Sequence, residues 1–248
     1  MKLTGNTILV TGGGSGIGRA LAEALHGIGN KVIAAGRRKS NLTDVVQANP
    51  GIDAVELDVT DPKSIASVAA ELITRYPKLN VLLNNAGVML IDDVSKPVDD
   101  KLLTSQFETN FFGTVRLTSA LIEHLKSQES ATILNVSSVL GFVPLAPATL
   151  YSATKAALHA YSMGLRYQLR DTSVRVQEIA PPWVQTDLLN SKEEPRAMPL
   201  KPFIEQTIAA LETDDHEILV ESAKPFRANP GVNEAAFFNQ VNDWFRQG

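Results

Sequence analysis

Tyr151 and Lys155 stand four residues apart in a stretch whose apolar spacing predicts a helix, so their side chains share one helical face. A tyrosine hydroxyl is a weak base near neutrality because its ordinary pKa is about 10. A neighbouring ammonium stabilises the phenolate and lowers that pKa, by about 1.4 kcal/mol for each pKa unit. The pair is therefore predicted to transfer a proton. Ser138, just past a predicted strand, could hydrogen-bond a carbonyl oxygen beside it.

A glycine-rich turn follows the first predicted strand, with the sequence TGGGSGIG from Thr11 to Gly18. Glycines let the chain turn tightly and approach a ligand without a Cβ clash. The helix that follows offers free N–H groups and a positive dipole end, which suit a pyrophosphate. A P-loop is disfavoured because Arg19 and Ala20 replace its Lys and Ser/Thr, and a nucleophile elbow fails at Ile17.

The elements that position these residues alternate between strand and helix along the whole chain. We expect strands at 6–11, 31–35, 53–59, 79–84, 132–136, 174–179 and 217–220, and helices at 16–29, 40–48, 61–75, 99–126, 151–170, 201–211 and 232–246. Ser40 is the expected cap of the second helix, and Asp61 caps the third, with Pro62 at its first position. Crossovers of this length predict a doubly wound parallel α/β sheet of Rossmann type, about seven strands with helices on both faces. We expect one domain over residues 1–248.

Composition excludes several classes of function. The 248 residues are 44% hydrophobic and 20% charged, which favours a folded core over disorder. The formal net charge of −4 argues against nucleic acid or an anionic membrane as the partner. No apolar run approaches the roughly 20 residues of a membrane span. Without cysteine and without histidines at ligand spacing, we expect no metal site. The absence of cysteine and of a visible targeting signal favours the cytoplasm.

The glycine turn resembles the nucleotide loop of the short-chain dehydrogenase/reductase family, T-G-x-x-x-G-x-G. Further motifs of that family follow in order over residues 5 to 187: an N-N-A-G motif at 84–87, the helix asparagine Asn110, Ser138 with the Y-x-x-x-K pair Tyr151 and Lys155, and a partial P-G-x-x-x-T match from Pro181 to Thr186. The resemblance implies an oxidoreductase that transfers a hydride between a nicotinamide and a small-molecule carbonyl or alcohol, with Tyr151 as general acid or base. It also implies that Lys155 tunes Tyr151 and holds the nicotinamide ribose, and that Asn110 supports a water leading protons to Lys155.

The second predicted strand ends in Gly36-Arg37-Arg38, where enzymes that use NAD place an acidic residue. Arginine suits a phosphate, so NADP(H) is predicted over NAD(H), with Arg37 as the main 2′-phosphate partner and Ser15 as a second. A solvated basic pair is the alternative. The resemblance implies that Asp58 and Val59 contact the adenine. The predicted cofactor-binding residues are Gly12, Ser15, Gly16, Ile17, Gly18, Arg37, Asp58, Val59, Asn85, Ala86, Gly87, Tyr151, Lys155, Pro181 and Thr186.

Pro182 stands where the family has glycine, so the contacts of this segment are open. Residues 182–203 are the expected substrate lid, and the aromatic tail after Val220, which includes Phe245, is expected to pack on the body or on a partner subunit. The predicted helix 151–170 is apolar nearly all round, and the family pairs this helix across subunits, so a homo-oligomer is expected, a dimer or a tetramer. A non-catalytic dinucleotide-binding sensor or scaffold on the same fold remains the alternative function.

Overall fold

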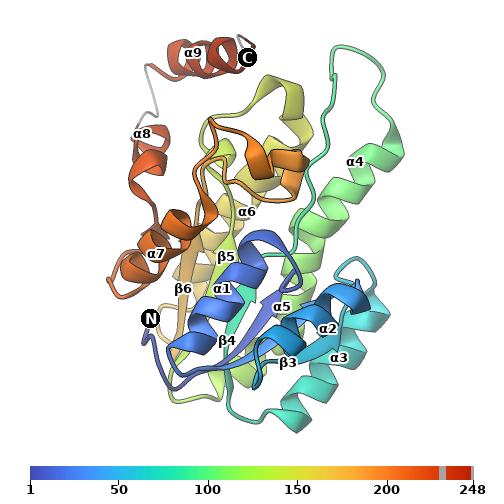
Figure 1. Ribbon diagram of the computed structural model, residues 1–248, viewed down its shortest axis with the longest axis vertical. Helices are drawn as coiled ribbons and strands as arrows, with labels where there is room; N and C mark the ends of the chain where they lie inside the picture. Colours follow the sequence, from blue (N-terminus) through green and yellow to red (C-terminus); the bar gives the residue numbers. More distant parts are fainter. Residues whose placement is uncertain (229–232, 247–248) are drawn as a thin grey trace.

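The computed structural model describes residues 1–228 and 233–246, with side chains up to residue 244. Seven parallel strands form one sheet in the order β3-β2-β1-β4-β5-β6-β7 (Figure 1). The predicted doubly wound parallel fold of seven strands is therefore confirmed. The strands are β1 (Thr7–Thr11), β2 (Lys31–Gly36), β3 (Asp53–Glu56), β4 (Leu79–Asn84), β5 (Ala131–Val136), β6 (Val174–Ile179) and β7 (Glu217–Ile218).

Helices cover both faces of the sheet, and β1 shows why, because its side chains alternate between two cores. Ile8 and Val10 face a cluster that contains residues of α1, α2 and α7, whereas Leu9 faces a cluster built with α3 and α5. The helices are α1 (Gly16–Gly27), α2 (Lys39–Ala48), α3 (Pro62–Arg75), α4 (Asp100–Phe107), α5 (Gly113–Lys126), α6 (Thr149–Gln168), α7 (Leu200–Leu211), α8 (Lys224–Arg227) and α9 (Glu234–Arg246).

Local signals placed most helix ends within a few residues. Asp61 caps α3 as predicted, accepting a hydrogen bond from the Lys63 N–H, and Pro62 occupies the first helical position. The prediction for Ser40 was wrong: α2 begins at Lys39 with Arg38 as N-cap, and the Ser40 hydroxyl bonds the neighbouring Asn41 side chain instead. Val232, the expected start of the last helix, and the side chain of Phe245 lie outside the described part of the chain.

The predicted helix over 99–126 is interrupted. A π-helical turn, η1 (Glu108–Phe112), separates α4 from α5. The helix passes very close to the β3–α3 loop there, since a Cβ on Gly113 would lie 2.5 Å from the Val59 carbonyl oxygen. A π-turn inserts one residue into the helix, and such turns often occur at functional sites. This one carries Asn110.

Two strands, β3 and β7, are shorter than the sequence predicts by more than one residue. β3 ends at Glu56 because its partner β2 ends at Gly36, and the Leu57 N–H makes the last bond to the Gly36 carbonyl. β7 retains two residues, Glu217 and Ile218, paired with Glu178 and Ile179 of β6. Among the described residues, none of the helices is both long and apolar enough for a membrane span.

Candidate active site

A cavity of about 1170 Å³ opens at the carboxyl ends of the parallel strands. Such a crevice is the usual ligand site of an open α/β sheet. The glycine turn forms one end of it, and the loops after β4, β5 and β6 form its floor and walls. Most residues singled out from the sequence line it: Gly12, Ser15, Gly16, Ile17, Arg37, Val59, Asn85, Ala86, Gly87, Ser138, Tyr151, Lys155, Pro181 and Thr186.

The glycine turn is shaped by Asn85, which follows β4. The Asn85 amide donates to the Thr11 carbonyl at 3.0 Å, and its side chain fills the space beside Gly12 and Gly18. A Cβ on Gly18 would lie 2.3 Å from Asn85 Nδ2, so no larger residue fits there. Gly18 thus lies beneath the turn rather than on the cavity surface. Gly12 and Gly16 have φ of +66° and +53°, the left-handed region that favours glycine.

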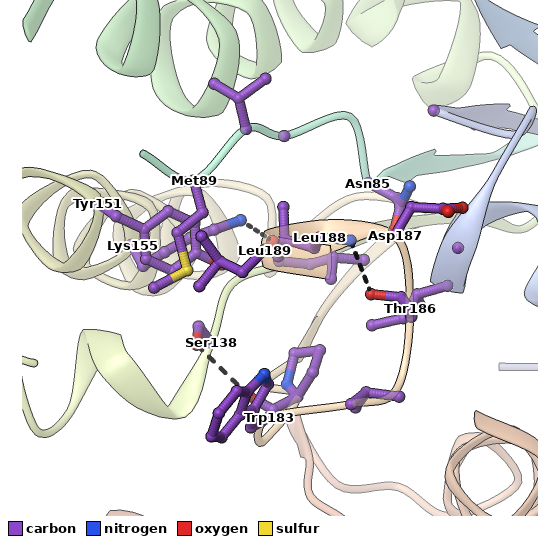
Figure 2. A pocket seen from close by; sticks show the side chains of 18 of the residues that line it. Asn85, Met89, Ser138, Tyr151, Lys155, Trp183, Thr186, Asp187, Leu188 and Leu189 are labelled. Carbon is purple, nitrogen blue, oxygen red and sulfur yellow. Dashed lines mark hydrogen bonds between the residues drawn. The ribbon is translucent and has the colours of Figure 1, made fainter. Parts of the chain in front are cut away.

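Ser138, Tyr151 and Lys155 all line the cavity, although Ser138 lies just past the end of β5 and the other two lie on α6. All three are buried. The Lys155 Nζ donates to the Val136 carbonyl at 2.8 Å and lies 5.5 Å from the centre of the Tyr151 ring. Figure 2 shows the three side chains together with Trp183, Leu188 and Leu189, which come from the loop after β6.

Burial is the largest influence on the pKa values of Tyr151 and Lys155. It raises the pKa of Tyr151 to about 12, partly offset by a hydrogen bond with Ser138. The sequence predicted that Lys155 lowers the pKa of Tyr151, but burial raises it instead, and the Lys155 ammonium donates to the Val136 carbonyl. Burial also lowers the pKa of Lys155 to about 8, against the opposing charge of Glu178. Near neutrality the phenol carries its proton and can donate it.

Asn110 lies behind the wall of the cavity rather than on it. Its Oδ1 accepts from the Val88 N–H at 2.8 Å, while its Nδ2 donates to the Val88 carbonyl at 2.9 Å and to Thr154 Oγ1 at 3.0 Å. It therefore ties the loop after β4 to α6. A Cβ on Gly87 would lie 3.3 Å from Asn110 Oδ1 and 3.8 Å from Lys155 Nζ, so both side chains approach this loop.

The far end of the cavity is basic. Arg37, Arg38 and Asn41 line it beside the glycine turn, and Arg38 Nη2 donates to Ser15 Oγ at 2.9 Å. The sequence singled out Arg37 but gave no signal for Asn41, which reaches the turn only because α2 folds beside it. Asp58 lies off the cavity: its Oδ1 accepts from Thr60 N and Oγ1, at 2.9 and 2.7 Å.

Several residues of the segment 182–203 line the cavity, among them Trp183, Leu188, Leu189 and Met198. A bridge between Val184 and Met198 closes this loop on itself, and the Trp183 indole donates to Ser191 Oγ at 2.8 Å. Leu189 and Asn190 have φ of 54° and 53°, a left-handed conformation that is strained for residues other than glycine. The carbonyl of Pro181 accepts from the Val139 N–H at 3.0 Å, which joins the start of the loop to the Ser138 segment.

The tail packs on the body of the protein. Asn242 of α9 donates to the Pro144 carbonyl at 3.1 Å, and its Oδ1 accepts from the Ala146 N–H. Trp244 reaches the cavity, where the Arg196 guanidinium lies 5.1 Å from the Trp183 ring and 5.9 Å from the Trp244 ring. Sequence reasoning missed Asn242 and Arg196, since their partners lie far away in the chain.

A comparison with protein families decides the identity. The model of the short chain dehydrogenase family matches residues 6–197. The chain belongs to the short-chain dehydrogenase/reductase family. The resemblance seen in the five ordered motifs is thereby confirmed, and the protein is an oxidoreductase of that family.

Relatives of this short-chain dehydrogenase/reductase extend over its whole length. It is 37% identical over 248 residues to the uncharacterized oxidoreductase DltE of Bacillus subtilis, covering 98% of both chains. A short-chain dehydrogenase from Burkholderia cenocepacia, solved in complex with NADP, has a TM-score of 0.85 at 29% identity, covering 97% of this chain and 99% of that one. One from Streptomyces avermitilis has a TM-score of 0.82 at 29% identity, covering 98% and 95%.

Proposed function

We propose that this protein interconverts a carbonyl and an alcohol with NADP(H) as cofactor and Tyr151 as the proton-transferring group. The observation that carries the proposal is the meeting of Ser138, Tyr151 and Lys155 in one cavity that continues to the glycine turn. The presence of all three residues argues against the alternative, a sensor or scaffold, because a protein that only binds a dinucleotide does not need a buried tyrosine and lysine in this cavity.

The residues around the glycine turn fit a nicotinamide dinucleotide. Gly12 and Gly16 have left-handed φ values, which favour glycine, and they leave the turn without side chains there. The N-terminus of α1 offers free N–H groups to a pyrophosphate. Lys155 and Thr186 line the cavity further along and would hold the ribose and nicotinamide end.

The phosphate on the ribose distinguishes NADP(H) from NAD(H). Arg37 and Arg38 meet the cavity at the end of β2, where NAD enzymes carry a carboxylate. The Arg38–Ser15 hydrogen bond brings a guanidinium and a hydroxyl to the same place, a donor set that suits a phosphate. We therefore assign the 2′-phosphate to Arg37, Arg38 and Ser15, and the adenine wall to Val59 with Asp58 behind it.

The chain's own residues supply the proton chemistry. When bound, the nicotinamide ring supplies or accepts the hydride. Ser138 Oγ, beside Tyr151, donates a hydrogen bond to the substrate oxygen. In reduction Tyr151 gives that oxygen its proton, and in oxidation it takes the proton back. Because burial raises the pKa of Tyr151 to about 12, the resting phenol is ready for the reductive direction.

The substrate end of the cavity is apolar. Its walls come from the loops after β4 and β5, from the proposed lid 182–203 and from the tail, with Met89, Leu145, Trp183, Leu188, Met198 and Phe226 among the lining residues. Burying apolar surface favours a hydrophobic molecule at this end. We propose a small-molecule aldehyde or ketone with an apolar body as the substrate class.

Tyr151→Phe tests the assignment. Turnover of a panel of aliphatic and aromatic aldehydes and ketones is followed by NADPH absorbance. We expect the variant to lose a factor of roughly 10² to 10⁴ in kcat, because general acid catalysis contributes on that scale. Its affinity for NADPH, measured by calorimetry, should remain. Retained turnover would overturn the role of Tyr151, and NADPH binding by a wild-type protein that turns over nothing in the panel would favour the sensor.

We also propose a homo-oligomer that acts in the cytoplasm. Phe112, the last residue of η1, and Met163 and Tyr167 of α6 are 41%, 50% and 68% exposed and leave apolar surface in contact with water. A second copy would cover them. Light scattering coupled to gel filtration measures the assembly, and a monomer at micromolar concentration would contradict it.

A further inference from the structure

Glu178 is a fully buried carboxylate directly behind the catalytic wall. It occupies the carboxyl end of β6, and its side chain is 0% exposed. The Ser137 hydroxyl donates to Oε1, and His159 Nδ1 lies 2.8 Å from Oε2. Burying a carboxylate without partners is costly, so these two bonds account for how it is tolerated. The proposed mechanism leaves this group without a role.

A second ion pair lies against this cluster at the sheet edge. Arg227 of α8 donates to both oxygens of Glu217 on β7, at 2.6 and 3.1 Å. The Phe142 ring lies 5.0 Å from the His159 ring and 5.2 Å from the Arg227 guanidinium. His159, Glu178 and Glu217 could geometrically hold a metal, since their ligand atoms lie within 4.8 Å. Arg227 already supplies the cation, so we interpret the cluster as an ion-pair network.

The backbone places Glu178 and Lys155 on opposite sides of one short segment. The Lys155 Nζ is anchored on the carbonyl of Val136, and the next residue, Ser137, holds Glu178. His159 follows Lys155 by one turn of α6, so the residue that bonds Glu178 and the lysine share a helical face. Glu178 is therefore bonded to Ser137, the residue that directly follows the one whose carbonyl holds the Lys155 ammonium.

Several elements supply the charged and polar groups around Glu178 and Lys155. Around Glu178 lie Lys155, His159 and Arg166 of α6, the Ser137 hydroxyl just past β5, Glu217 of β7 and Arg227 of α8. Towards Lys155 face Tyr151 on its own helix, the Val136 carbonyl and, across Gly87, Asn110.

We propose that Glu178 is a positioning residue of the reaction, whose buried charge keeps the Lys155 ammonium protonated beside Tyr151. This rests on the proposed function, in which Tyr151 transfers the proton and the Lys155 ammonium holds the ribose of the cofactor beside it. Arg227 and His159 are the cationic partners of the two carboxylates in this network.

The physical reason lies in two opposing effects on Lys155. Burial lowers its pKa to about 8, and the Glu178 charge raises it. Without Glu178 the pKa of Lys155 would fall further towards neutrality, and a growing fraction of the lysine would be neutral at working pH. His159 shares the carboxylate, and its own pKa is raised by that hydrogen bond.

The test is a direct titration of Lys155 by nuclear magnetic resonance. The full-length protein is labelled with carbon-13 at the lysine Cε, and the Lys155 signal is assigned with Lys155→Met. Glu178→Gln should lower the pKa of Lys155 by roughly half a pKa unit or more, because it removes one nearby charge at nearly constant shape. Glu178→Asp, which keeps the charge, should lower it by less.

Glu217→Gln is the matched control, because it removes a carboxylate of the same network whose charge does not act on the pKa of Lys155. Its Lys155 titration should match the wild type. If Glu178→Gln does not fold, the double variant Glu178→Gln with His159→Gln removes both partners together and should give the same downward shift.

An unchanged Lys155 pKa in the Glu178→Gln protein, or an equal shift in Glu217→Gln, would overturn the proposal. Neither result touches the proposed function, which depends on turnover by the wild type and its loss in Tyr151→Phe. A second readout is the pH profile of kcat for the aldehyde or ketone that the panel identifies. Its alkaline limb should move to lower pH in Glu178→Gln and stay in place in Glu217→Gln.

Discussion

The two ends of the cavity are built in different ways. At the glycine turn, Thr11, Gly12 and Gly18 pack against Asn85 so closely that a single added Cβ would overlap an atom 2.3 Å away. At the other end, α9 is tied down through Asn242, which bonds carbonyl and amide groups almost 100 residues earlier in the chain. The first end is closely packed backbone, and the second is a wall held by a few side chains. The closely packed end is the one we propose for the cofactor, and the more loosely held end is the one we propose for the substrate.

Gly18→Ala should produce the largest effect. The new Cβ would meet Asn85 Nδ2 and the Gly12 carbonyl, and overpacking of this kind destabilises by roughly 3 kcal/mol or more. Urea unfolding measures the loss. The control is Gly27→Ala in the last turn of the same helix, where nothing lies within 4 Å of the added atom. It should be neutral or stabilise by up to about 1 kcal/mol. Equal stability of the two variants would contradict the close packing.

Arg37→Ala and Arg38→Ala test the basic end of the cavity with a smaller effect. Each should reduce kcat/KM for NADPH by roughly 10- to 100-fold, the value of one charge-assisted phosphate contact. The same constant for NADH should change little, because NADH has no 2′-phosphate. If the wild type prefers NADH, or if kcat/KM falls equally for NADPH and NADH, the arginines do not bind the 2′-phosphate.

Trp244→Ala should produce the smallest change, at the substrate end. Removing this ring opens the wall near Arg196, so KM for a bulky apolar ketone should rise roughly 3- to 10-fold through lost apolar contact. NADPH affinity should not change. Asn242→Ala should act in the same direction by loosening α9. A loss of NADPH binding in either variant would mean that the two ends of the cavity are coupled.

Signals that span a few residues were sufficient for much of this structure. Local propensity and spacing predict that the motifs follow strands and that the glycine turn follows the first of them. They also predict that α3 begins at Asp61 and Pro62. The break at η1 could not be predicted, because it arises where Gly113 meets the Val59 carbonyl from another segment. The sequence predicted that Arg37 and Ser15 share one phosphate, but only the fold shows that it is Arg38, 23 residues away, that bonds Ser15.

The sequence by itself determined which residues stand at the carboxyl ends of the strands, because alternation and turn chemistry are local properties of the chain. It also determined that Tyr151 and Lys155 share a helical face, since that follows from helix geometry. Only the tertiary structure decided their protonation. The pKa of Tyr151 rises and that of Lys155 falls because distant segments exclude water from both, and desolvation depends on what packs around a group. For the same reason the side chain of Glu178 in β6 became fully buried behind the site.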